Sequence, residues 1–90
     1  MMDIVFTKHA QIRSKQRKLS FKLISKTIKN PDIKSLEDEK TNKIAYFRKY
    51  KPNLAIKVVA KIQDKHIIVI TVHPVKIKDL SNVKPLIENL

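Results

Sequence analysis

The spacing of the apolar residues changes its period at Asn30-Pro31. Before this point, apolar side chains from Phe21 to Ile28 recur at helical spacing, which predicts an amphipathic helix that the proline ends. After it, residues 44–50 and 54–62 show the two-residue period of strands. A chain that is helical first and then extended throughout is typical of the α+β class.

Capping and turn residues divide the rest of the chain. Thr7 and Ser20 can each accept a hydrogen bond from a free backbone amide, so we expect each to begin a short helix. The segment from His66 to His73 is β-branched and apolar on both faces, which predicts a central strand. The expected elements are strands at 3–6, 33–36, 44–50, 54–62 and 66–73, helices at 8–18 and 21–29, and a short docking helix at 83–90.

We therefore expect a single domain over residues 1–90 with an α+β fold. Two N-terminal helices would pack on one face of an antiparallel meander sheet of four strands, within a range of three to five.

The charge of the chain is strongly positive and unevenly distributed. Lysine and arginine number 20 against 8 acidic residues, which gives a net charge of +12. The first 30 residues hold eight of these cations and a single acid, Asp3. Such a field favours a polyanionic partner such as RNA or DNA. Compositional bias in a chain rich in lysine, isoleucine and asparagine is the competing explanation.

Several protein classes are excluded by residues that the sequence lacks. Without glycine there is no glycine-rich phosphate loop, so nucleotide-dependent enzymes are poor candidates and we expect no cofactor. Without cysteine there is no disulfide framework, thiol nucleophile or cysteine-bound zinc. No apolar run is long enough to span a membrane and the N-terminus does not resemble a signal peptide, so we expect a cytoplasmic protein that does not bind membranes.

One group of candidate site residues lies on the first expected helix. His9, Arg13 and Arg17 are spaced four apart, which places them in one stripe on a helix. Arginine forks can hold phosphate oxygens, and histidine can move protons near neutral pH. The alternative is an ordinary solvated basic face.

A second group lies on the expected strands. Thr71 and His73 end the central strand, and Tyr46 and Arg48 share one face of a neighbouring strand, so together they would suit an acid–base site without metal. Strand-end solvation and ordinary sheet packing are the alternatives. His66 begins its strand beside a turn, and we expect it to be exposed. The three histidines have no metal-ligand spacing, and we expect no metal site.

These features resemble the family catalogued as domain of unknown function 4258. The resemblance is carried by His9-Ala10, Arg13 and Arg17, by Leu19-Ser20, by a second helix that ends at Asn30-Pro31, and by a strand that contains Ile70-Thr71-Val72. Lys18 stands where this family usually has glycine. Because a lysine at positive φ costs roughly 1 kcal/mol, we expect the turn to differ there.

That family is similar to the RelE, ParE and BrnT toxins, within a ribonuclease-like fold shared with barnase and the colicin nucleases. The resemblance implies a toxin-like domain with a RelE-like fold, often a metal-independent endoribonuclease that a cognate antitoxin inhibits. Some relatives, such as ParE, act on gyrase instead. His9, Arg13 and Arg17 match the helix motif and Thr71 matches the strand motif.

Two functions are compatible with these observations. The first is a toxin-like, metal-independent endoribonuclease. In it, His9 or His73 accepts a proton from the attacking hydroxyl, and the remaining one of these two histidines, or Tyr46, protonates the leaving group. The charge that develops on the phosphate oxygens is stabilised by Arg13, Arg17 or Arg48. Lys8, Lys15, Arg48 and Thr71 are then the candidate nucleic-acid-binding residues. The second is a basic module that binds nucleic acid or protein without catalysis.

Overall fold

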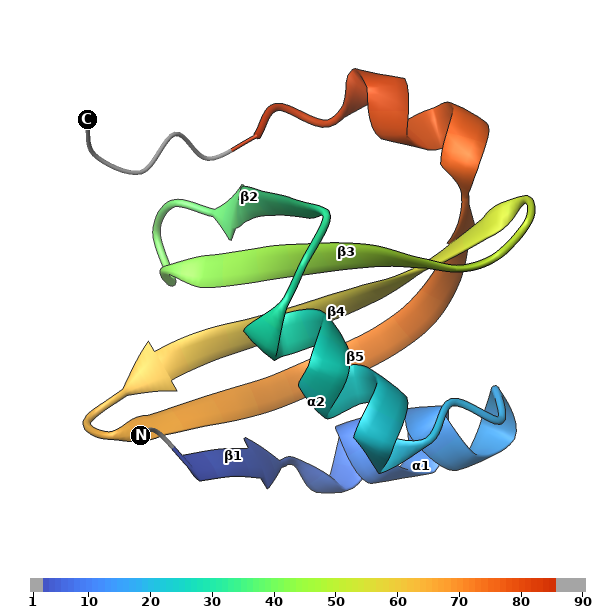
Figure 1. The fold of residues 1–90 in the computed structure, drawn as a ribbon. Coiled ribbons are helices and arrows are strands. Elements are labelled where there is room, and N and C mark those ends of the chain that lie inside the picture. Colours follow the sequence, from blue (N-terminus) through green and yellow to red (C-terminus); the bar gives the residue numbers. More distant parts are fainter. Residues whose placement is uncertain (1–2, 86–90) are drawn as a thin grey trace.

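The computed structural model describes residues 3–85 and has an α+β architecture (Figure 1). The elements in chain order are β1 (Asp3–Phe6), α1 (Lys8–Gln16), α2 (Phe21–Lys29), β2 (Ile33–Asp38), β3 (Lys43–Lys51), β4 (Leu54–Gln63), β5 (His66–Lys76) and a 3-10 helix, η1 (Ile77–Asn82). The helix expected at 83–90 is not formed at 83–85, and the rest of that segment lies outside the described residues.

Both helices begin where the sequence predicts. The Thr7 hydroxyl accepts a hydrogen bond from the backbone amide of Ala10 at 3.1 Å, and the Ser20 hydroxyl accepts one from Leu23 at 3.1 Å. Each cap satisfies an amide that the first turn of a helix leaves free. α2 ends at Lys29, and its C-cap Asn30 directly precedes the proline.

The sheet has five strands in the order β1-β5-β4-β3-β2. Strands β2 to β5 form the expected antiparallel meander, joined by short turns. β1 pairs with β5 in the parallel direction, from Asp3 opposite His66 to Phe6 opposite Val69, so the expectation of a purely antiparallel sheet is wrong. A tight hairpin forces its strands to be antiparallel, but β1 is joined to β5 only through the rest of the domain.

The core lies between the helices and one face of the sheet. α2 packs against β3 and β4, while α1 packs against β5 and β1 at the edge. Ile24 of α2 is fully buried with Ile56 and Val58 of β4, and Val72 of β5 joins the same cluster. We call the opposite side of the sheet the distal face; Phe47, Lys57, Val59, Thr71 and His73 lie on it.

An irregularity in β5 decides which residues reach the distal face. Thr71 pairs with Val59 and Val69 pairs with Ala60, so Ile70 is an extra residue in the ladder. Such a bulge reverses the alternation of side chains beyond it. Ile68 and Thr71 therefore share a face, which strict alternation does not allow.

Candidate functional site

A row of side chains crosses the distal face from β3 to β5. In this row Phe47 pairs with Lys57, and Lys57 pairs with His73. The Lys57 ammonium lies 5.8 Å from the centroid of the Phe47 ring. The same ammonium forms an ion pair with Glu37 of β2, at 3.0 Å to Oε1 and 3.2 Å to Oε2. A cation and a carboxylate therefore lie beside the histidine.

Glu37 reaches Lys57 because β2 is irregular at this point. Its neighbours Leu36 and Asp38 pair with Ile44 and Lys43, which leaves Glu37 as an extra residue in the ladder. The side chains of Glu37 and Lys57 are 38% and 19% exposed, so solvent weakens the ion pair. We assign this pair mainly to orienting the Lys57 ammonium near His73.

A shallow pocket of about 330 Å³ opens next to this row. Its lining residues come from β2, β3, β4 and β5: Glu37, Asp38, Lys43, Val59, Ile70, Thr71 and His73. Thr71 and His73, expected together from the sequence, do lie together here. The pocket brings an imidazole, a hydroxyl, two carboxylates and an ammonium to one place on the sheet.

The electrostatic environment lowers the pKa of His73 below its ordinary value. Partial burial is the largest cause, followed by the positive charges of Lys57 and Arg17, while the Glu37 carboxylate acts in the opposite direction. The imidazole is consequently neutral at pH 7 and able to accept a proton. Arg17, at the C-terminal cap of α1, is close enough to His73 for its charge to act on the ring.

The expected stripe on α1 is present, but only one end of it approaches His73. Arg13 Nε donates to His9 Nε2 at 3.5 Å, and Arg13 Nη1 donates to Gln16 Oε1 at 3.4 Å. His9 is exposed, and it lies two helical turns from Arg17, about 12 Å along the axis. We therefore place Arg17 near His73 but outside the pocket lining, while His9 and Arg13 lie farther toward the N-terminus of α1.

Tyr46 and Arg48 do not lie with Thr71 and His73, contrary to the expectation from the sequence. Tyr46 pairs with Val58 and is buried in the core with 4% of its surface exposed. Arg48 lies on the same helix-covered face, and its Nη1 donates to the backbone oxygen of Asn30 at 2.6 Å, at the end of α2. The alternation in β3 correctly predicts that the two share a face, but that face is the buried one.

Of the expected nucleic-acid-binding residues, Lys8 and Lys15 are exposed on α1. Lys15 lies on the side of α1 that faces the start of α2, away from Arg13 and Arg17. Thr71 lines the pocket, whereas Arg48 stabilises the end of α2.

Two important residues of the pocket region, Glu37 and Lys57, were not expected from the sequence. Lys57 does carry a signal, because it is the single charged residue in the apolar stretch 54–60. Glu37 carries none, because the strand expected at 33–36 ends before it, whereas the strand in fact continues to Asp38.

Comparison with known proteins decides the family. The model of the family described as Domain of unknown function (DUF4258) matches residues 6–74. The chain belongs to this family. The matched segment contains Arg17, Glu37, Lys57, Thr71 and His73, so the whole distal-face site lies within the family domain. Searches of curated proteins and of solved structures found no match.

Two further findings concern residues 3–85. No group of three or more histidine, aspartate or glutamate side chains in this range is placed to hold a metal ion. Over the same range, no helix has the length and apolar character needed to cross a membrane.

Proposed function

We propose that this DUF4258 domain is a toxin-like endoribonuclease that cleaves RNA at the distal-face pocket without a metal ion. The observation that carries the proposal is the convergence of His73, Lys57 and Arg17 beside a pocket, with His73 neutral at pH 7. A neutral imidazole near two cations suits proton abstraction next to a phosphate. The two helices before a four-stranded meander also agree with the resemblance to RelE, ParE and BrnT toxins.

In the proposed reaction the 2′-hydroxyl oxygen of the substrate attacks the adjacent phosphorus. His73 takes the hydroxyl proton as the new bond from oxygen to phosphorus forms. Arg17 and Lys57 stabilise the charge that accumulates on the phosphorane oxygens. The bond from phosphorus to the 5′-oxygen then breaks and Lys57 gives that oxygen a proton, which leaves a 2′,3′-cyclic phosphate and a 5′-hydroxyl.

Phosphate binding would also prepare His73 for its role. In the free protein, partial burial lowers the pKa of His73 most, and the charges of Lys57 and Arg17 lower it further. A bound phosphate offsets both charges, so the imidazole becomes a stronger base when the substrate is in place.

The test is cleavage of RNA by the purified protein in the presence of EDTA, with DNA of the same sequence as the control substrate. We expect cyclic-phosphate ends from RNA and no cleavage of DNA, because DNA lacks the attacking hydroxyl. His73→Gln and Lys57→Gln are expected to lower kcat at least about 100-fold. His66→Gln changes the exposed histidine at the other end of β5, so it should retain activity.

Three outcomes would contradict this mechanism: cleavage of DNA, loss of RNA cleavage in EDTA, or full activity of His73→Gln. Binding of RNA without cleavage under any condition would favour a non-enzymatic binding module. The toxin assignment has its own readout, since induction in a bacterial host should arrest growth with the wild type and not with His73→Gln.

A further inference from the structure

A groove of about 500 Å³ lies between α1 and the beginning of α2. Gln11, Lys15 and Lys18 line it from the first helix and the turn, and Leu19 and Phe21 line it from the second side. The two groove residues of α1, Gln11 and Lys15, lie on the side of the helix roughly opposite His9, Arg13 and Arg17. The groove is therefore separate from the proposed RNA site.

The groove exposes an aromatic side chain. Phe21 is 53% exposed, and its ring contacts Phe6, with 4.5 Å between centroids. Leu19 is 3% exposed and joins the core beneath. A half-exposed aromatic beside a preformed pocket is typical of a surface that binds an apolar side chain of another molecule.

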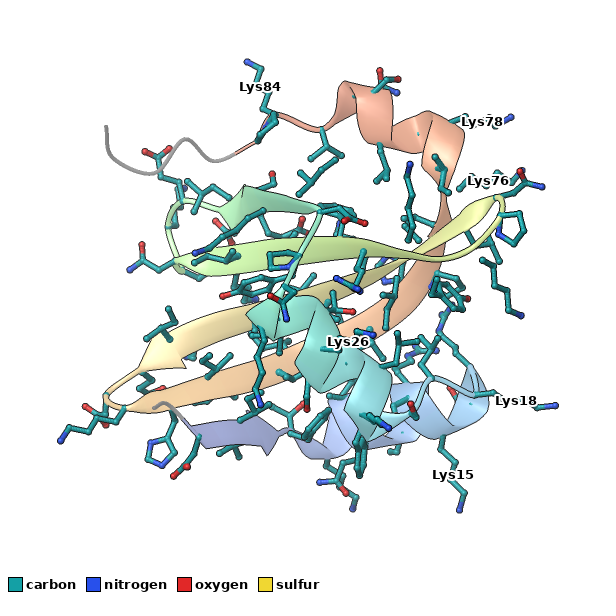
Figure 2. The ribbon with its side chains drawn as sticks, viewed as in Figure 1. Lys15, Lys18, Lys26, Lys76, Lys78 and Lys84 are labelled. Atoms are coloured by element: carbon teal, nitrogen blue, oxygen red, sulfur yellow. The ribbon has the colours of Figure 1, made fainter. Side chains whose placement is uncertain are left out.

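The groove is also bordered by positive charge. Lys15 and Lys18 are both exposed, and Figure 2 shows them extending away from the domain at the C-terminal end of α1. The sequence contains no acidic residue between Asp3 and Asp32, so both helices carry only cations. A complementary partner must therefore combine apolar and acidic groups.

We propose that this groove is a docking site for an acidic segment of a partner protein. An apolar side chain of that segment packs against Leu19 and Phe21 while its carboxylates face Lys15 and Lys18. The apolar floor favours a protein segment over a nucleic-acid backbone, since phosphates need cations but no buried apolar contact.

The experiment uses the full chain and a synthetic helical peptide with leucines on one face and glutamates on the other. The chain has no tryptophan, so Phe21→Trp places a single fluorescent reporter in the groove. At physiological salt, we expect the acidic peptide to cause a saturable blue shift of the tryptophan emission maximum. A peptide whose glutamates are replaced by lysines should cause no shift of this maximum. In the wild type, NMR shift changes should centre on Leu19 and Phe21.

A matched charge comparison separates docking from general attraction. Lys15→Glu with Lys18→Glu, made in the reporter variant, should weaken peptide binding about tenfold or more. Lys78→Glu, which changes an exposed lysine on η1, should have little effect. The proposal is overturned if Lys78→Glu has an equal effect, if the acidic peptide gives no saturable shift, or if only single-stranded RNA moves the reporter. Ribonuclease activity does not enter these outcomes, so the two proposals fail separately.

Discussion

Partial burial and two cations act on the imidazole of His73 in the same direction. Both disfavour the protonated ring, and only the Glu37 carboxylate favours it. The sequence identifies His73 as a candidate from its position at the end of an apolar strand. Arg17 is also a candidate from the helical spacing, but its proximity to His73 depends on how α1 packs against β5. The pairing of His73 with Lys57 likewise depends on the register between β4 and β5.

The lowered pKa of His73 makes the free energy of unfolding depend on pH. In the unfolded chain this residue titrates near 6.5, and in the folded protein it titrates lower, so the unfolded state binds more protons between the two values. The protein should therefore lose stability as pH falls through 6.5 toward the folded pKa. Urea unfolding at several pH values measures this, and His73→Gln should reduce the loss whereas His66→Gln should not. A difference between wild type and His73→Gln that stays constant with pH contradicts the prediction.

At the scale of elements, the turn between the helices keeps its geometry although it lacks glycine. Lys18 has φ 54, its amide donates to Lys15 O at 3.2 Å, and the Leu19 amide donates to Ser14 O at 2.9 Å. These bonds form the Schellman motif, which usually has glycine at the position of Lys18. The expectation that the turn would differ at this lysine is therefore wrong, because the two hydrogen bonds and the burial of Leu19 hold it in place.

Replacing Lys18 with glycine should stabilise the protein by about 1 kcal/mol, since glycine adopts positive φ without steric cost. Lys26→Gly makes the same chemical change at an exposed position inside α2 and should destabilise by about 1 kcal/mol. Urea midpoints of the two variants and the wild type measure both effects. Equal destabilisation by the two substitutions would contradict a strained lysine in the turn.

The elements that the sequence predicts best are those set by neighbouring residues. Thr7 and Ser20 cap their helices, Asn30-Pro31 ends α2, and the meander follows its short turns. The direction of β1 and the extra residue Ile70 depend on pairing between distant segments, which local periodicity does not contain. The composition of the site is therefore the hardest feature to predict from the sequence, because it depends on which face of each strand is turned toward the helices.

At the scale of the whole molecule, the positive charge is more dispersed in space than along the sequence. Figure 2 shows labelled lysines from α1, α2, β5 and η1 pointing in different directions. Even on α1, Lys15 and Arg17 lie on different sides of the helix. Only part of the net charge of +12 can therefore contact one RNA strand at a time.

This distribution of charge predicts that the affinity for RNA depends only moderately on salt concentration, and that a few specific residues determine this dependence. Each cation that contacts a phosphate releases counterions, so log Kd plotted against log salt should have a slope set by the contacting residues and not by the net charge. Arg17→Gln and Lys57→Gln should each lower the slope by about one, while Lys78→Gln on η1 should leave it unchanged. Fluorescence anisotropy with single-stranded RNA from about 50 to 200 mM salt measures the slopes. If the affinity for RNA does not change with salt concentration across this range, the positive charge reflects amino-acid composition alone. Equal slopes in all three variants would place the RNA elsewhere than the distal face, because the charges of Lys57 and Arg17 both act on His73, which lines the pocket there.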